Sequence, residues 1–288
     1  MEYTNEKLLE MFENSLKGEK KSNNTIEKYL RDVNEFLNNI NKSVKEIKRI
    51  DIKMYLGQKS NLSSSTISGI LSSLKSFFSF LVLDLELLES DCTYSIKAPK
   101  VKNRTKKTLT IEKAETLVDY SKNVRDRAII YLLINSGIRV SELINLTLTQ
   151  YNNRDEDDCI TLLCKGDKLG DVYLSERAIE YINDYLKVRK ESEFDNLFIS
   201  NQNGKMDRQS MSRTWKTLAR RSGMFNAEEI SCISNHLMRA TCATLLSDNG
   251  TPIETVQQVL HHSSPSTTAR YIKVNKDRVK MAMGSNIF

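Results

Sequence analysis

The segment at 97–107, which reads KAPKVKNRTKK, places the strongest limit on how this chain can fold. It contains six basic residues, no acidic residue and a single proline. A helix is not expected to cross Pro99, because proline lacks the backbone donor and clashes with the preceding turn. We therefore predict an extended basic linker over 97–107 between one domain at 1–96 and another at 108–288. The unopposed charges favour contact with phosphates, although a plain solvated linker would have a similar composition.

The domain at 1–96 is predicted to be helical. Apolar residues recur at helical spacing from Ile26 to Ile40 and again from Ile67 to Leu81, and the serines at 63–65 can cap the second of these helices. The other face of that helix carries short hydroxyls and one lysine: Ser68, Ser72, Lys75, Ser76 and Ser79. This face suits contacts with DNA phosphates, with Lys75 as the charged contact, but a solvated face is the simpler interpretation.

The domain at 108–288 is predicted to mix helices with a β-hairpin. Thr110 can cap a helix to about residue 121, and a helix over 125–135 is expected to stop before Gly137, with a short helix from Val140. Two apolar runs then flank a turn containing Gly and Asp, a pattern typical of a hairpin. That hairpin is predicted from Ile160 to Leu174, a helix capped by Ser175 follows, and 197–199 is predicted to be a short strand.

The C-terminal third is predicted to be helical again, with one helix over 236–247. Thr251 to Glu254 predicts a capping box with Pro252 in the first helical position. Ser264 and Pro265 are expected to begin the helix that carries Tyr271. The predicted fold class is mainly α with a small β-hairpin: a helical N-terminal domain followed by a mixed α/β domain.

Several basic residues and a tyrosine are spaced in a way that suggests phosphate chemistry. His236 and Arg239 share a helix face, and Tyr271 follows His262 by nine residues. Arg139 comes directly after the predicted helix break, with Glu142 three residues later, and Lys165 lies at the hairpin tip. Taken singly, each has a plain alternative: His236 and Arg239 as a surface pair, Arg139 and Glu142 as a salt bridge, Lys165 as a solvated lysine.

Taken together, these side chains fit the attack of a tyrosine on a phosphodiester. Two arginines can stabilise the negative oxygens of the transition state, and a histidine can take the phenol proton. A lysine on the hairpin can protonate the leaving hydroxyl, and Lys165 and Lys168 both lie on its turn. Because fixed cations do this work, no cofactor and no metal is expected.

In this order and spacing the chain resembles the tyrosine recombinases, the family of phage integrases and Xer-type recombinases. The likeness is densest over 130–146 and 236–274, where the chain reads GIRVSEL and LHHSSPSTTARYIKV. The family pattern is Arg, a hairpin Lys, His-x-x-Arg, His or Trp, and Tyr. It matches Arg139, Lys165, His236, Arg239, His262 and Tyr271.

The resemblance implies a site-specific DNA recombinase and a role for each matched residue. Arg139, Arg239 and His262 would bind the scissile phosphate, and Glu142 would support the arginine site. His236 would be the general base and Lys165 the general acid, chosen over Lys168 because it precedes Gly166 as the family's lysine precedes its turn. Tyr271 would form a 3′-phosphotyrosine, and strand exchange would pass through a Holliday junction.

The resemblance also implies partners and a mode of assembly. The domain at 1–96 resembles the core-binding domain that clamps DNA opposite the catalytic domain. The family acts as a homotetramer on double-stranded DNA with inverted-repeat core sites. DNA contacts are expected at Lys75 and at the linker residues Lys102, Arg104, Lys106 and Lys107. The tail beyond Tyr271 is expected to dock on a neighbouring subunit.

Three positions depart from the family pattern. Leu169, Gly170 and Asp171 stand where an arginine often follows the hairpin lysines, which puts one DNA contact in doubt. His261 replaces the usual glycine before the late histidine, and Ala240 replaces a frequent histidine. A separate arm-binding domain before Leu8 is not expected, which favours a resolvase, an invertase or a small element's integrase.

Composition is consistent with these expectations and excludes little. The net charge of +6 permits a polyanionic partner without proving one, and the five cysteines form no CxxC pair, so reduced thiols in the cytoplasm are expected. No signal peptide and no membrane span are expected. Three alternatives stay open: a DNA-binding protein with an inactive catalytic site, a topoisomerase of the same chemistry, and a metal-dependent nuclease. The sequence has no carboxylate cluster that would support the nuclease. The target sequence and the outcome of recombination cannot be predicted.

Overall fold

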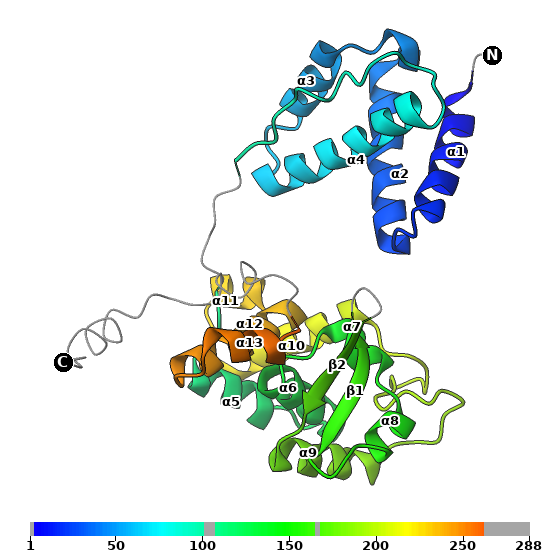
Figure 1. Ribbon diagram of the computed structural model, residues 1–288. Coiled ribbons are helices and arrows are strands. Elements are labelled where there is room, and N and C mark those ends of the chain that lie inside the picture. Colours follow the sequence, from blue (N-terminus) through cyan, green and yellow to red (C-terminus); the bar gives the residue numbers. More distant parts are fainter. Residues whose placement is uncertain (1–2, 101–106, 165–167, 262–288) are drawn as a thin grey trace, which may run out of the picture. The chain divides into compact units, whose positions relative to one another are not determined.

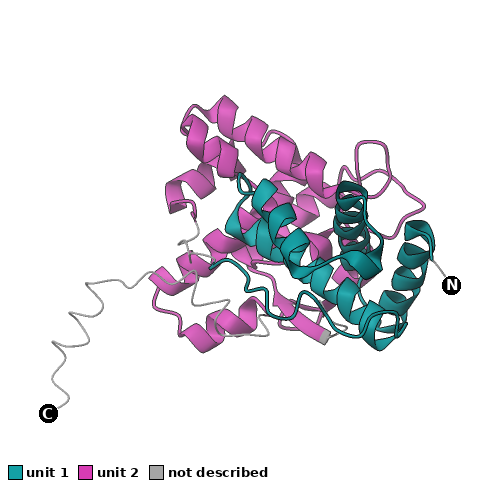
Figure 2. Ribbon diagram, turned by 90° about the horizontal axis from the view of Figure 1, so that it is seen from above, with its two compact units in different colours: residues 1–102 teal, residues 103–288 magenta. Residues whose placement is uncertain are grey.

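The computed structural model describes residues 3–100, 107–164 and 168–261. The chain forms two compact units, residues 1–102 and 103–288, shown in different colours in Figure 2. Most described residues are helical, and the described part contains one two-stranded antiparallel sheet (Figure 1). The predicted fold class is therefore confirmed. The boundary between the units falls inside the basic segment at 97–107, and the residues 101–106 lie outside the described part of the chain.

The described part of the first unit, residues 3–100, contains four α-helices and one 3-10 helix. They are α1 (Asn5–Gly18), α2 (Asn23–Ile40), η1 (Val44–Glu46), α3 (Arg49–Gln58) and α4 (Ser64–Leu83). Their apolar stripes meet in one core, where Phe12, Phe77 and Phe80 pack together. Thr4 and Ser63 cap α1 and α4 through side-chain oxygens that accept backbone N–H groups, so local chemistry sets where these helices begin.

A buried ionic network joins α2 to α4 inside this unit. Asp32 is 5% exposed and accepts hydrogen bonds from Lys28 Nζ at 2.7 Å and Ser73 Oγ at 2.8 Å. Lys28 Nζ also donates to the Gly69 carbonyl at 3.0 Å. Each polar atom of the pair thus has partners, as a buried charge requires, and the network fixes the register of the two helices.

By length and composition, α4 is also apolar enough to cross a membrane, although no span was expected from the sequence. Along it Leu71, Leu74 and Phe78 are buried in the core of the first unit. The core helix of a folded domain can have this length and composition, so these two properties do not by themselves define a membrane span.

The second unit places helices around the hairpin and a larger core. Its helices are α5 (Ile111–Asp119), α6 (Val124–Asn135), α7 (Val140–Asn145), α8 (Leu148–Asn152), α9 (Glu176–Leu186), α10 (Arg208–Ser222), α11 (Ala227–Cys232), α12 (Asn235–Asp248) and α13 (Ile253–Val259). The strands are β1 (Cys159–Cys164) and β2 (Lys168–Tyr173), paired from Cys159 opposite Tyr173 to Cys164 opposite Lys168. Trp215 of α10 is fully buried and donates to Asn235 Oδ1 at 2.7 Å, which ties α10 to the start of α12.

Several predicted helices are confirmed with shifted ends, and two local predictions are wrong. Residues 197–199 do not form a strand: Ile199 makes an isolated bridge to Lys205, and Asn196 makes one to Thr147. The capping box at Thr251 is also absent. Pro252 is the N-cap of α13 with extended backbone angles and no side-chain cap bond, so the helix begins at Ile253.

Candidate active site

Arg139 lies at the N-cap of α7, immediately after a turn that only glycine fits. Gly137 has φ +63°, and a Cβ built there would approach Leu260 Cδ2 to 2.5 Å. The Arg139 guanidinium donates through Nη1 to Glu142 Oε1 at 2.7 Å and through Nη2 to the His261 carbonyl at 2.8 Å. The side chain keeps 24% of its surface exposed. Both terminal nitrogens of the guanidinium are therefore hydrogen-bonded, and the side chain is still partly exposed to solvent.

Glu142 anchors Arg139 from the first turn of α7. Its Oε2 accepts the Arg139 backbone N–H at 2.8 Å, while its Oε1 accepts the guanidinium, and the side chain is only 4% exposed. Burial alone would raise the pKa of Glu142. Hydrogen bonds from the Arg139 side chain and backbone, together with the charges of Arg139 and Arg239, outweigh burial and lower the pKa. Glu142 is thus an anion at neutral pH, which is the state that orients the arginine.

Arg239 is buried beside Arg139 although it lies on another helix. It is 4% exposed and projects from α12, with Nη1 donating to the Gly137 carbonyl and Nη2 to the Leu260 carbonyl. The two arginines therefore bind successive carbonyls, those of Leu260 and His261, at the end of α13. The corner before α7, helix α12 and the end of α13 meet at this point, directly before His262.

His236 lies in the first turn of α12, three residues before Arg239. Ser234 is the N-cap of this helix, and its side chain accepts the Leu237 N–H. His236 is exposed whereas Arg239 is buried, so the two differ in depth although they share the helix face that their spacing predicted. A base at the surface and a cation beneath it can both reach a phosphate that enters from solvent.

Two residues at this site were not predicted from the sequence. Cys164, at the end of β1, is buried, and its Sγ lies 3.2 Å from His261 Nδ1. His261 Nε2 lies 2.9 Å from the Asp171 carbonyl of β2. The one signal available was the departure at His261, where the family has glycine. That departure did not reveal the cysteine, which is 97 positions away.

The remaining predicted residues are only partly placed. Lys165, His262 and Tyr271 lie outside the described residues, as do Lys102, Arg104 and Lys106. Lys107 is described and forms an exposed ion pair with Glu228. Lys75 is half-buried on α4 in the first unit. Of the predicted catalytic set, the structure thus brings together Arg139 and Arg239 with their support, Glu142.

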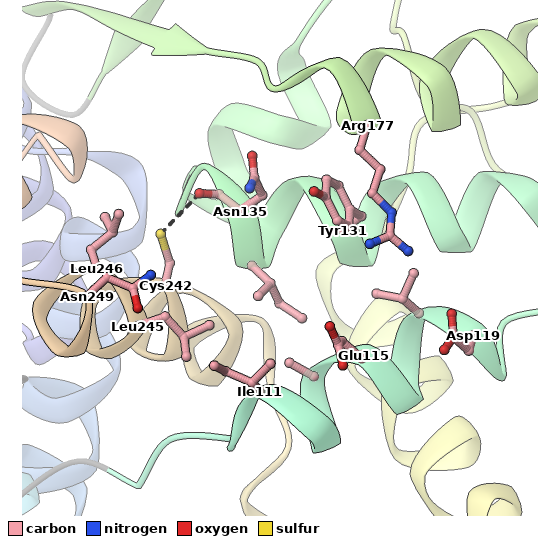
Figure 3. Close-up of a pocket in the computed structure, with 13 residues that line it drawn as sticks. Ile111, Glu115, Asp119, Tyr131, Asn135, Arg177, Cys242, Leu245, Leu246 and Asn249 are labelled. Atoms are coloured by element: carbon pink, nitrogen blue, oxygen red, sulfur yellow. Dashed lines mark hydrogen bonds between the residues drawn. The ribbon is translucent and has the colours of Figure 1, made fainter.

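The second unit has one hollow against this cluster and another that none of the cluster residues lines. One of about 690 Å³ lies against the cluster and is lined by Ser136, Gly170, Tyr173, His261 and other residues of β2 and α13. Another of about 490 Å³ lies between α5, α6 and α12 (Figure 3). In it Glu115 and Arg177 project from opposite sides, and Arg177 lies 5.5 Å from the Tyr131 ring centroid. The arginine site has no carboxylate other than Glu142 in the contacts described above, so it favours an anionic substrate.

Sequence and structure comparisons agree on one family. Residues 107–278 match the profile of the Phage integrase family, and residues 9–84 match the N-terminal SAM-like domain of phage integrases. The tyrosine recombinase XerD of Halalkalibacterium halodurans is 30% identical over 276 residues, which cover 90% of each chain. The tyrosine recombinase XerC of Leptospira interrogans serogroup Icterohaemorrhagiae serovar copenhageni is 31% identical over 299 residues, covering 97% of this chain and 93% of the relative.

Solved structures show the same fold. The crystal structure of XerA recombinase is 26% identical, covers 99% of both chains and superposes with a TM-score of 0.54. The Tn1549 transposon integrase, residues 82–397, was solved in complex with circular intermediate DNA. It is 18% identical, covers 96% of this chain and 98% of its own, and has a TM-score of 0.75.

Proposed function

This chain belongs to the phage integrase family of tyrosine recombinases, and from that premise we propose that it cleaves and rejoins DNA through a covalent bond to Tyr271. It is a site-specific DNA recombinase. The observation that most supports the assigned residues is the convergence of Arg139 and Arg239 on the carbonyls of Leu260 and His261. That convergence brings both guanidiniums to the residues directly before His262.

In the proposed mechanism the two arginines and His262 bind the non-bridging oxygens of the scissile phosphate. Their charges oppose the negative charge that builds up as the phosphorus becomes five-coordinate. Glu142 holds Arg139 in the orientation that this role needs, because both of its carboxylate oxygens accept hydrogen bonds from that residue.

Proton transfers accompany the two bond changes. His236 takes the phenol proton as Tyr271 Oη attacks phosphorus, and Lys165 donates a proton to the leaving 5′ oxygen. The products are a 3′-phosphotyrosine and a free 5′-hydroxyl. The 5′-hydroxyl of a partner strand then attacks the phosphotyrosine and releases Tyr271, which gives a Holliday junction after one exchange. Lys168 is the alternative acid on the same hairpin.

The proposed partner is duplex DNA whose core site carries inverted repeats, bound by four copies of the chain in the cytoplasm. Support for a DNA partner comes from the similarly folded Tn1549 integrase, which was solved with circular intermediate DNA. Lys75 and the basic segment with Lys102, Arg104, Lys106 and Lys107 are the proposed contacts outside the active site. We propose that the chain has two domains, residues 1–96 and residues 108–288, and that the basic segment joins them.

The test of the nucleophile is Tyr271→Phe. We expect this variant to bind its DNA site, since the phenol oxygen contributes little to affinity, but to form no covalent adduct on a nicked suicide substrate in EDTA. Tyr173→Phe is the matched control, because Tyr173 is an exposed tyrosine on β2 and should leave adduct formation intact. An adduct formed by the Tyr271→Phe protein would assign the chemistry to another nucleophile.

A further inference from the structure

Three side chains of different chemistry face one another beside Arg139. One carboxylate oxygen of Glu142, the Cys164 sulfur and one ring nitrogen of His261 lie within 4.8 Å of one another. Glu142 and Cys164 are buried, and His261 is half-buried. One comes from α7, one from β1 and one from the end of α13, so the fold rather than a local turn brings them together.

The hydrogen bonds of His261 leave the ring in the state that a metal ligand needs. The Asp171 carbonyl can only accept, so the His261 Nε2 at 2.9 Å must carry the proton. The other nitrogen, Nδ1, then has a free lone pair in the neutral ring, and it points to Cys164 Sγ at 3.2 Å. A ligating histidine is usually held in this way, with its second nitrogen bound to a carbonyl or carboxylate.

The neighbouring backbone leaves room for this cluster only because position 170 is glycine. A Cβ at Gly170 would approach Cys164 Sγ to 2.7 Å and His261 Cε1 to 2.8 Å. Gly170 and His261 are both departures from the family pattern, and here they contact each other. His261 also has φ +45°, a backbone angle that suits glycine better than histidine. The histidine is therefore present at a position where its backbone is strained.

We propose that Glu142, Cys164 and His261 form a binding site for a thiophilic divalent cation, with Zn²⁺ the best match, and that its binding inhibits DNA cleavage. One thiolate, one imidazole and one carboxylate are ligands that Zn²⁺ takes, and three protein ligands leave one position for water. With ordinary Zn²⁺ bond lengths, tetrahedral ligand atoms lie roughly 3.3–3.8 Å apart. The sulfur and Nδ1 lie 3.2 Å apart, close to this range, and all three ligand atoms lie within 4.8 Å of one another, so shifts of roughly 1 Å or less would complete the site.

Binding exchanges one proton for the metal. The ordinary pKa of a thiol is about 8.5, so a cysteine sulfur carries a proton at neutral pH before a cation binds. When the cation binds, the S–H bond breaks, the proton passes to solvent and the sulfur forms the bond to the metal. Metal binding is therefore expected to release about one proton per site.

The inhibitory effect, which rests on the proposed function, follows from the two partners of Arg139. Its guanidinium is held by Glu142 Oε1 at 2.7 Å and by the His261 carbonyl at 2.8 Å. A cation that draws the carboxylate toward Cys164 removes the first partner, and its positive charge repels the guanidinium. Arg139 then loses the orientation proposed for phosphate binding.

Binding is tested first, with Co²⁺ as the probe and without DNA. The full-length protein should show a thiolate-to-cobalt charge-transfer absorption at one equivalent, and Zn²⁺ should displace it. Cys164→Ser and His261→Gly should each weaken Co²⁺ binding by more than about 10-fold, since even loss of an outer partner of a ligand costs about 10–100-fold. Cys159→Ser is the matched control, a buried cysteine at the other end of β1, and should keep the absorption. No such absorption in the wild type, or full absorption in Cys164→Ser, would overturn the proposal.

Inhibition is tested second, as adduct formation on the nicked suicide substrate. One equivalent of Zn²⁺ should slow the wild type by at least roughly 10-fold, with recovery in EDTA, and should leave Cys164→Ser unaffected. Equal inhibition of both proteins would overturn the regulatory part. A wild type that forms no adduct even in EDTA would contradict the proposed function, while the Co²⁺ spectra still decide whether the site binds metal.

Discussion

At the scale of single residues, Glu142 connects the stability of the second unit to its chemistry. Its lowered pKa means that the carboxylate form of Glu142 is more stable, relative to the protonated acid, in the folded state than in the unfolded state. The stabilisation is therefore fully present above the unfolded pKa, near 4.3, and is lost as pH falls through the lower folded pKa. Glu142→Gln should reduce the free energy of unfolding by about 1.5–3 kcal/mol at pH 7, the range for hydrogen bonds to charged groups.

The measurement is urea unfolding of both proteins between pH 3 and pH 7. The difference between wild type and Glu142→Gln should shrink as pH falls below about 4. Asp184→Asn is the matched control: Asp184 and Lys187 also form a salt bridge at i, i+3, but both side chains are more than half exposed, and its loss should change little. A Glu142→Gln difference that stays constant with pH would mean that the charge of Glu142 contributes nothing to stability.

The part of the site that could be predicted consists of contacts between residues that are close in the sequence. The Arg139–Glu142 pair is local, and its i, i+3 spacing predicted the contact that the structure has. The burial of Arg239 could not be predicted, because its partners are the carbonyls of Gly137 and Leu260, and a carbonyl belongs to every residue type. The Cys164–His261 contact could not be predicted because the two residues are far apart in the sequence and only the tertiary fold brings them together.

At the scale of elements, helix starts were predicted where one side chain satisfies the first turn. Ser63, Thr110 and Ser175 all accept the backbone N–H that such caps accept, as expected from their chemistry. The α10 helix was not predicted although its apolar spacing, with Met211, Trp215 and Leu218 buried, carried the signal.

The segment at 197–199 shows why an apolar run alone cannot define a strand. Its backbone changes partners along its length: the Leu197 N–H donates to the Leu146 carbonyl at 2.7 Å, while Ile199 bridges to Lys205. A strand needs successive residues paired with one partner, and sequence periodicity does not report which partner is in reach.

The basic segment between the units gives a prediction that separates its lysines. Lys107 is already paired with Glu228, so exchanging that partner for a phosphate gains less than one full phosphate contact, which releases a counterion of the DNA. Replacing Lys102, Arg104 and Lys106 with alanine should flatten the dependence of log binding constant on log salt by roughly 2–3 units. Lys107→Ala alone should flatten it by less than about 0.9 units.

Fluorescence anisotropy on one DNA site at several salt concentrations measures both slopes. An unchanged slope in the triple variant would make the segment a solvated spacer without phosphate contacts. A Lys107→Ala effect as large as one full contact would mean that the pair with Glu228 opens when DNA binds.

At the scale of the whole molecule, each unit has a core of its own. The aromatic cluster around Phe77 stabilises the first unit, and the core around Trp215 stabilises the second. Catalysis by the second unit and additional DNA contacts by the first can therefore be carried by separately stable parts. Assembly of several copies then needs a further contact, and the proposed one is the tail after Tyr271.

The tail and the cavity in Figure 3 have complementary chemistry. Residues 276–288, which read KDRVKMAMGSNIF, carry three basic residues and one acidic residue at 276–280, followed by mainly apolar and small residues. The cavity combines the acidic Glu115 and Asp119 of α5 and the basic Arg177 of α9 with the apolar Leu245 and Leu246 of α12. A tail from a neighbouring copy would place cations near the carboxylates and apolar side chains against the leucines.

Deleting residues after Asn275 should therefore leave the binding of one copy to a half-site unchanged. It should lower the cooperativity with which a second copy binds by roughly 5–150-fold, the usual range of coupling between sites.

Reversing Glu115 and Asp119 to lysine should reproduce that loss in a full-length protein, because like charges would repel the basic tail. Glu112→Lys is the matched control, since Glu112 is exposed on the same helix and does not line the cavity. Gel-shift titrations on half-sites and full sites measure both affinities. Full cooperativity in the truncated protein would show that the tail takes no part in assembly. Full cooperativity in the charge-reversed protein alone would place its docking site elsewhere than this cavity.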